Sequence, residues 1–341
     1  MREGAVLTKR KLLSHAAMIA VPLVWINLAG LATAYAQKKP TIAYAQAELI
    51  NDWRVTNQKD MEEHAKQAGV NFITTSADQD ASKQLADVED LLAKHPDVLV
   101  LSPLESVALA PAVTMADDAG VPLIVIDRTL NAKPGTGMYK TEITQSHYNS
   151  GKLLAEKTVE LLKKRNGAAK GNVVHVQGMA GASPVLDANK GWDEVMSAYP
   201  DIKTIATADA GFTKEGGIRV MQDFLQRFPA GGIDVVRTDY SDMTLGAIDA
   251  IKNANRKELL GYLVGEGGYY LAIEAVANGD IARETQTPPY FGELAMASAE
   301  KILHGEAVPA QQQVPIKVFD ADKKEEAKAY LDQIKSKGLK F

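Results

Sequence analysis

The sequence predicts an α/β fold of two doubly wound, parallel-sheet lobes joined by a hinge of several chain crossings. Strand-like and helix-like segments alternate almost without interruption from residue 41 onward, which is the rhythm of a mainly parallel sheet. That rhythm breaks over residues 131–145 and again at residues 287–289, where turn-forming Gly and Pro gather. At 341 residues the chain is long for one hydrophobic core and comfortable for two domains.

The first lobe is organised around a strand that ends at Asp127. The apolar, β-branched run from Pro122 to Ile126 is bounded by charge at its end, so we expect a strand buried on both faces. Other strands of this lobe are expected at residues 41–46, 70–75 and 97–101. Helices between them are expected to end at Gly69, before Pro96 and at Ala119. The turn-rich segment 131–145 is predicted to hold the first crossing.

The same rhythm restarts in the second lobe with a helix over residues 146–164. Strands are expected at residues 172–177, 203–208, 235–239 and 262–265, and helices at 186–199, 214–228, 244–253 and 269–278. After the prolines we expect a helix at 291–303, a strand at 314–318 and a charged helix at 322–334. The predicted lobes are therefore residues 37–142 plus 290–315 and residues 143–289 plus 316–341.

The amino terminus has the layout of a secretory signal peptide. Lys9-Arg10-Lys11 precede an apolar run that closes on Ala34-Tyr35-Ala36, which predicts cleavage after residue 36. An uncleaved anchor is the alternative, but Pro22 and Asn27 interrupt the run. We expect residues 1–36 to be removed and the mature protein to be exported.

Composition limits the classes of function. The net charge is −5, and the signal peptide carries more basic than acidic residues, so the mature chain is more acidic still. Such a protein repels phosphate backbones, and no basic stripe with interleaved aromatics appears, which argues against nucleic-acid binding. The absence of Cys excludes disulfides, thiolate metal sites and a Cys nucleophile.

Polar and aromatic residues follow several predicted strands, at the edge where open α/β sheets bind ligands. Asp127 and Arg128 offer charge-assisted hydrogen bonds, with a structural salt bridge as the alternative. Trp53 and Phe212 could each stack on a sugar or pack a helix, and Arg54 adds donors. Asp242 and Glu266 could accept hydroxyl hydrogen bonds or cap helices. The candidate ligand-binding set is Gln46, Trp53, Arg54, Asp127, Arg128, Phe212, Asp242, Glu266 and Gln286.

Enzyme, metal and cofactor signatures are weak. The six histidines have no pair at ligand spacing, and no Walker loop or G-x-S-x-G elbow is present. The glycines around Glu266 are not a dinucleotide fingerprint, because Tyr270 takes the place of the third glycine. We therefore expect no catalysis, no metal and no cofactor. A hydrolase using Asp127 and Glu266 stays open as an alternative.

The chain resembles the periplasmic sugar-binding proteins of bacterial ABC importers, the type I group that includes ribose- and galactofuranose-binding proteins. The resemblance spans essentially the whole mature chain. It is carried by Gln46, Trp53-Arg54, Ile126-Asp127-Arg128, Gln177-Gly178, Gly181-Ala182-Ser183, Gly211-Phe212-Thr213, Ser241-Asp242 and Thr287-Pro288.

This resemblance implies a type I periplasmic binding protein that closes on a monosaccharide or small polyol and delivers it to a membrane permease. It implies a monomer, and a chemoreceptor as a further possible partner. The second lobe departs from the family pattern: Ala188 stands where an arginine is usual, Ser241 where an Asn is usual, and Gly267 where an Asp is usual. A lactose-repressor-type regulator shares the core but needs an amino-terminal helix-turn-helix where this chain has an export signal.

Overall fold

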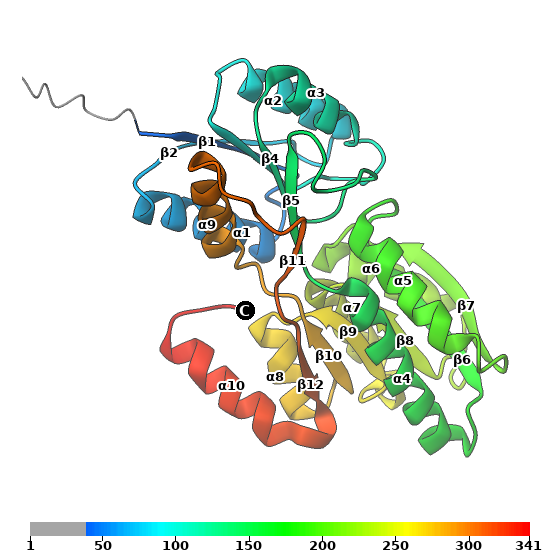
Figure 1. The fold of residues 1–341 in the computed structure, drawn as a ribbon. Coiled ribbons are helices and arrows are strands. Elements are labelled where there is room, and N and C mark those ends of the chain that lie inside the picture. The colour runs from blue at the N-terminus through cyan, green and yellow to red at the C-terminus, as the bar shows by residue number, and fades with distance from the viewer. Residues whose placement is uncertain (1–38) are drawn as a thin grey trace, which may run out of the picture. The chain divides into compact units, whose positions relative to one another are not determined.

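Two six-stranded sheets form the framework of the molecule (Figure 1). The computed structural model describes residues 39–341, so the expected signal peptide lies outside the described residues. The strand orders are β11-β5-β4-β3-β1-β2 and β12-β10-β9-β8-β6-β7. Every neighbouring pair is parallel except β10 with β12, which confirms the α/β class and the two parallel-sheet lobes.

The first lobe contains one sheet and the helices on its two faces. Its strands are β1 (Thr41–Gln46), β2 (Asn71–Ser76), β3 (Val98–Leu101), β4 (Leu123–Asp127), β5 (Tyr139–Thr144) and β11 (Gln311–Gln313). Its helices are α1 (Asp52–Gln67), α2 (Ala81–Leu92), α3 (Pro111–Ala119) and α9 (Gly292–Leu303). Alternate residues of β4 join different core clusters: Ile124 packs in the cluster of Met61 from α1, and Val125 in that of Leu91 from α2. Both faces of β4 are therefore covered, as its apolar run predicts.

The second lobe repeats this plan. Its strands are β6 (Gly171–Gln177), β7 (Ile202–Asp209), β8 (Val235–Thr238), β9 (Leu263–Gly267), β10 (Arg283–Gln286) and β12 (Lys317–Asp320). Its helices are α4 (His147–Asn166), α5 (Ser183–Met196), α6 (Lys214–Arg227), α7 (Ser241–Asn253), α8 (Tyr270–Asn278) and α10 (Lys324–Ser336). Val173 and Val235 pack with Trp192 of α5, whereas Val174 and Val236 pack with Phe224 of α6.

Two strands were missed by the sequence patterns. β5 lies inside the segment that was expected to be turn-rich, because its sequence YKTEIT has no continuous apolar run. β10 is polar throughout, yet Glu284, Thr285 and Gln286 are buried, because the strand lies inside the sheet, between β9 and β12, and α4 and α8 contact it. Burial of such strands is decided by their neighbours, and a pattern of apolar residues does not detect it.

The strand expected at residues 314–318 is wrong as a single element. Gln311–Gln313 pairs with β5 in the first sheet, and Lys317–Asp320 pairs with β10 in the second. Pro315 lies between them, where the chain passes from one sheet to the other. The other two crossings follow β5 and β10, and the boundary expected at residue 142 falls inside β5, which continues to Thr144. Across residues 39–341, no helix is both long and apolar enough to span a membrane.

Candidate functional site

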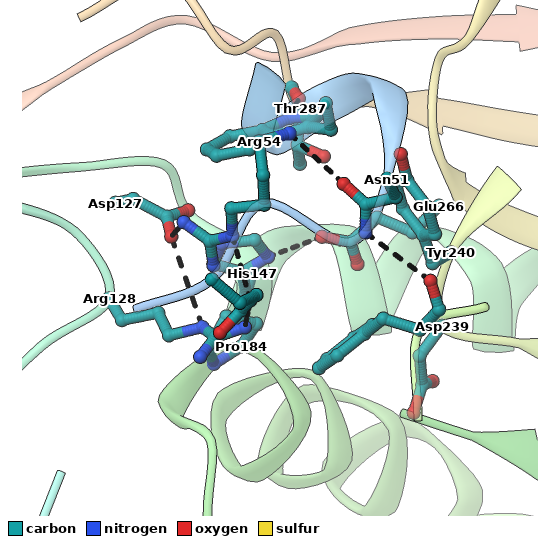
Figure 2. Close-up of a pocket in the computed structure, with 13 residues that line it drawn as sticks. Asn51, Arg54, Asp127, Arg128, His147, Pro184, Asp239, Tyr240, Glu266 and Thr287 are labelled. Carbon is teal, nitrogen blue, oxygen red and sulfur yellow. Dashed lines mark hydrogen bonds and ion pairs between the residues drawn. The ribbon is translucent and has the colours of Figure 1, made fainter. Parts of the chain in front are cut away.

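A cavity of about 50 Å³ lies between the carboxyl ends of strands from both sheets (Figure 2). This volume holds a few water molecules. Six of the nine candidate residues line it: Trp53, Arg54, Asp127, Arg128, Phe212 and Glu266. The remaining lining residues are Glu48, Asn51, His147, Pro184, Asp239, Tyr240 and Thr287.

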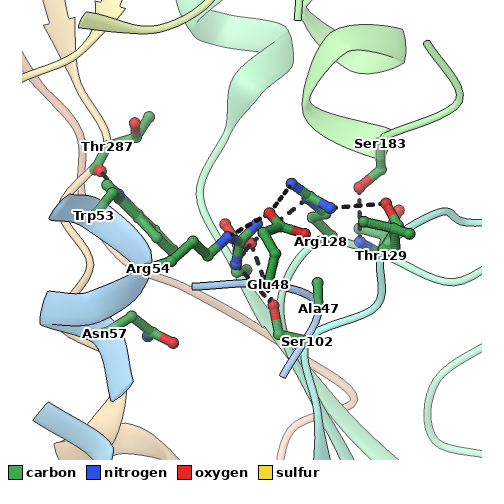
Figure 3. A network of polar contacts seen from close by, with 12 residues as sticks. Ala47, Glu48, Trp53, Arg54, Asn57, Ser102, Arg128, Thr129, Ser183 and Thr287 are labelled. Carbon is green, nitrogen blue, oxygen red and sulfur yellow. Dashed lines mark hydrogen bonds and ion pairs between the residues drawn. The ribbon is translucent and has the colours of Figure 1, made fainter. Parts of the chain in front are cut away.

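The first-lobe wall is a buried cluster of alternating charges (Figure 3). Arg54 places Nε 2.9 Å from Glu48 Oε1 and Nη1 2.7 Å from Asp127 Oδ2. Arg128 Nη2 lies 2.8 Å from the same Glu48 Oε1, while its Nη1 donates to the Leu104 carbonyl at 2.8 Å. One glutamate thus holds both guanidinium groups, and the expected Asp127 and Arg128 pair belongs to a four-residue network.

Burial and charge act in opposite directions on these arginines. Burial lowers the pKa of Arg54, but the carboxylates of Asp127 and Glu48 outweigh it, so its pKa is raised. Burial dominates at Arg128, whose pKa is lowered although Glu48 attracts its charge. Glu48 Oε2 and Arg128 Nε are buried and have no hydrogen-bond partner within residues 39–341. This wall therefore holds an acceptor and a donor whose hydrogen-bonding capacity no described residue uses.

The backbone has a positive φ at two residues that line the cavity, one from each lobe. Asp127, the last residue of β4, has φ 65°, and Phe212 has φ 58° directly after Gly211 with φ 62°. A positive φ is uncommon outside glycine, and for a bulky residue such as Phe it is a real outlier. Such strain persists where surrounding contacts impose it, and it clusters at functional sites. Both residues line the cavity.

The two predicted aromatic residues are partly covered by arginines. The Arg54 guanidinium carbon lies 4.7 Å from the centre of the Trp53 ring, and Trp53 Nε1 donates to the Thr287 carbonyl at 2.7 Å. Phe212, from the second lobe, lies 5.5 Å from the Arg128 guanidinium of the first. Both rings line the cavity, and each also joins the lobes, Trp53 through its hydrogen bond to Thr287 and Phe212 through its contact with Arg128.

The second-lobe wall presents two carboxylates, Glu266 and Asp239. Glu266, in β9, contacts His147 Nδ1 and accepts a hydrogen bond from Ser150 at 2.8 Å. Burial lowers the pKa of His147, but attraction to Glu266 outweighs it, so the pKa is raised. His147 Nε2 is buried and has no hydrogen-bond partner among the described side chains and backbone.

Asp239 follows β8 and has three partners. His175 Nε2 lies 2.7 Å and Arg237 Nη2 3.3 Å from its Oδ1, and Gly178 N donates to its Oδ2 at 3.0 Å. Burial raises the pKa of Asp239, but His175 and Arg237 outweigh it and hold the pKa at about 2. Asp239 is therefore an ionised acceptor at neutral pH.

Three candidate residues do not line the cavity. Gln46 is fully buried beside it, where its amide donates to Asn57 Oδ1 at 3.1 Å and accepts from Ala47 N at 3.1 Å. Gln286 turns toward α10 and donates to the Tyr330 hydroxyl at 2.6 Å. Asp242 lies in the first turn of α7, where burial, together with Asp52 and Glu215, raises its pKa to about 6.

Sequence patterns missed two groups of lining residues. Glu48 and Asp239 lie just after β1 and β8, so the strand-end rule that selected Asp127 could also have selected them. His147 starts α4 and Thr287 follows β10, and nothing in the local pattern separates them from ordinary cap and loop residues. No group of three or more His, Asp or Glu side chains in residues 39–341 is arranged to hold a metal ion.

Comparison with known proteins gives consistent findings. A family model described as "Periplasmic binding protein domain" matches residues 42–307. The ribose import binding protein of Bacillus subtilis is 31% identical over 283 residues, which cover 83% of this chain and 88% of that protein. The xylitol-binding protein of Mycolicibacterium smegmatis is 27% identical over 82% of this chain and 76% of its own length. A Mycobacterium smegmatis structure in complex with β-D-fucofuranose superposes with a TM-score of 0.80, at 29% identity, over 87% of this chain and 96% of that chain.

Proposed function

Because the chain belongs to the periplasmic binding protein domain family, we propose that it is the solute-binding component of an ABC importer and captures a monosaccharide or small polyol. The observation that carries the proposal is the cavity between the two lobes, with a charged cluster on one wall and two carboxylates on the other. Free donors and acceptors on both walls match a solute whose hydroxyl groups donate and accept.

The proposed ligand contacts are the six candidate residues that line the cavity, together with Glu48, His147 and Asp239. Gln46, Asp242 and Gln286 would act from outside the cavity. The proposed lobes are residues 37–142 plus 290–315 and residues 143–289 plus 316–341, and their rotation about the three crossings would open and close the site. Strand pairing supports this division, apart from the last residues of β5.

Membership of this family also supports a cellular location and a binding partner for the protein. Its relatives include import binding proteins, so we propose that this protein is exported through residues 1–36, works in the periplasm as a monomer and delivers its solute to a membrane permease. A chemoreceptor is a second possible partner of the closed form. The members named above are binding proteins, and this favours capture over the hydrolase and regulator alternatives.

A thermal-shift panel of ribose, galactose, fucose, arabinose and xylitol tests the proposal. A solute present at a hundred times its dissociation constant stabilises the folded protein by about 2.7 kcal/mol, which is a readily measured shift. We expect a saturable shift with at least one member and no change in that compound by chromatography. Conversion of a panel member to a product would establish a hydrolase instead, and no shift with any member would contradict the proposal.

A further inference from the structure

Arg237 is a buried cation that lacks hydrogen bonds to the described residues at two of its three nitrogen atoms. It lies in β8, it is 2% exposed, and its guanidinium carbon lies 4.6 Å from the centre of the Trp192 ring. Its Nε and Nη2 make no hydrogen bond within residues 39–341. A buried guanidinium that lacks hydrogen bonds is costly, so its presence calls for an explanation.

Two nearby carboxylates offset the cost of burying Arg237. Its Nη2 lies 3.3 Å from Asp239 Oδ1, and the charge of Glu266 also stabilises its guanidinium. Both carboxylates line the cavity (Figure 2), whereas Arg237 does not. Arg237 therefore lies behind the second wall and acts on the solute only through the residues in front of it.

The titratable groups around the pair of Asp239 and Arg237 come from four elements. β6 supplies His175, β8 supplies Arg237, β9 supplies Glu266, and α5 supplies Asp193, whose charge acts on both His175 and Arg237. Burial, followed by repulsion from Arg237, lowers the pKa of His175. Burial and Arg237 therefore both favour a neutral imidazole at His175, and Arg237 together with His175 favours the ionised carboxylate of Asp239.

We propose that Arg237 is a positioning residue of the solute site, which holds Asp239 as an ionised acceptor and selects solutes that present neutral hydroxyl groups to this wall. The proposal rests on the proposed function. In the wild-type protein, the negative charge of Asp239 is offset by the permanent cation Arg237, and that of Glu266 by His147. Without Arg237 the wall gains net negative charge, which favours an amino group on the solute over a hydroxyl.

Two variants of Arg237 test this role. Arg237→Met keeps an unbranched apolar chain on Trp192 and removes the charge, while Arg237→Lys keeps the charge and removes the planar fork. With the panel sugar that binds most tightly, we expect calorimetry to give about a tenfold loss of affinity for the methionine variant and a smaller loss for the lysine variant. The methionine variant should also gain affinity for the corresponding 2-amino sugar relative to the neutral one.

Arg165 provides a matched control. It belongs to the same lobe, its guanidinium carbon lies 4.3 Å from the Tyr262 ring, and it pairs with Asp234 before β8, at the opposite end of the sheet. Arg165→Met should lower the unliganded melting temperature without changing affinity or selectivity. Equal affinity and selectivity in Arg237→Met and wild type would overturn the proposal, even if Arg237→Met is less stable.

A measurement without solute separates this proposal from the proposed function. Titration of the His175 ring by NMR should show a higher pKa in Arg237→Met than in wild type, because the repulsion from Arg237 is gone. If no panel member binds wild type, the proposed function fails, and this titration still decides whether Arg237 controls Asp239. An unchanged His175 titration would refute that control. If the methionine variant does not fold, Arg237→Gln, which also removes the charge, must show the same gain in relative affinity for the amino sugar, and the lysine variant must keep the selectivity of wild type.

Discussion

Asp127 is both a structural and a candidate binding residue. Its carboxylate is paired with buried Arg54 at 2.7 Å, and its positive φ turns the chain at the end of β4. The salt-bridge and ligand interpretations of the sequence are therefore compatible. Substitution by Asn separates charge from conformation, because Asn tolerates a positive φ, whereas Ala at this position would add backbone strain.

Asp127→Asn should weaken solute binding more than it weakens folding. Loss of a charge-assisted acceptor is expected to reduce affinity roughly tenfold to a hundredfold. The free energy of unfolding should fall by only about 1–2 kcal/mol, because Arg54 keeps its contact with Glu48. Calorimetry and urea unfolding measure the two quantities.

Asp60 offers the control for this substitution. It lies on α1, where it accepts a hydrogen bond from Gly292 N at 2.6 Å, and it does not line the cavity. Asp60→Asn should affect stability alone. If Asp127→Asn behaves in the same way, Asp127 is a purely structural residue.

At the level of elements, β10 shows how a strand can be buried without an apolar sequence. Glu284, in this strand, accepts hydrogen bonds from Ser241 Oγ at 2.6 Å and Gly268 N at 3.2 Å through Oε1. Its Oε2 is buried and has no partner among the described residues. Burial raises the pKa of Glu284 to about 7, and the charge of Glu266 adds to this effect.

The raised pKa of Glu284 predicts a loss of stability with rising pH. Because the folded protein holds this proton more tightly than the unfolded chain, its stabilising contribution is complete below about pH 4.5 and is lost as the pH rises through about 7. Glu284→Gln keeps the acceptor oxygen and stays neutral. At pH 8 the variant should be more stable than wild type, by on the order of 2 kcal/mol, and the difference should disappear near pH 4.5.

Urea unfolding of both proteins from pH 4.5 to 8 measures the effect. The difference between variant and wild type is the informative quantity, because other titrating groups are common to both. A constant difference across this range would show that Glu284 is not protonated in the folded protein.

At the level of the whole molecule, several hydrogen bonds join the lobes around the cavity. Thr129 N donates to Ser183 Oγ at 2.8 Å, and Asn51 Nδ2 donates to the Phe212 carbonyl at 3.3 Å. Thr129 is the residue after Arg128, which belongs to the first-lobe wall, and Ser183 is the first residue of α5 (Figure 3). Closure around a solute and formation of these contacts should therefore be coupled.

Ser183→Ala should weaken binding without weakening the unliganded protein. The lost hydrogen bond contributes about 1 kcal/mol to the closed form, so affinity should fall roughly fivefold. In an open form water satisfies the Thr129 N–H in both proteins, and the unliganded melting temperature should stay the same. Calorimetry and thermal unfolding provide the two measurements.

Ser197→Ala is the control for closure. Ser197 directly follows the same helix as its C-cap, and its hydroxyl donates locally to the Glu194 carbonyl at 2.7 Å. It should change neither affinity nor closure. A drop in melting temperature that is equal with and without solute in Ser183→Ala would mean that the lobes stay in contact without solute.

The sequence by itself determined the features that depend on neighbouring residues. The alternation of strands and helices, the doubly buried β4 and the strand-end positions of Asp127, Arg128 and Glu266 follow from local periodicity and turn chemistry. Those features predicted the α/β class and six residues that line the cavity. They failed at β5 and β10, whose burial depends on the helices that pack on the sheet at these strands.

Only the tertiary structure decided which side chains meet. Glu48 pairs with Arg128, 80 positions further along the chain, and His147 meets Glu266 across 119 positions. Strand order brings these residues together, and no local pattern encodes that order. The same is true of Arg237, which reads as an ordinary strand residue in the sequence and lies behind Asp239 because β8 pairs with β6 and β9. The local sequence determines which polar side chains lie at the strand ends, and long-range packing determines which of them form buried ion pairs.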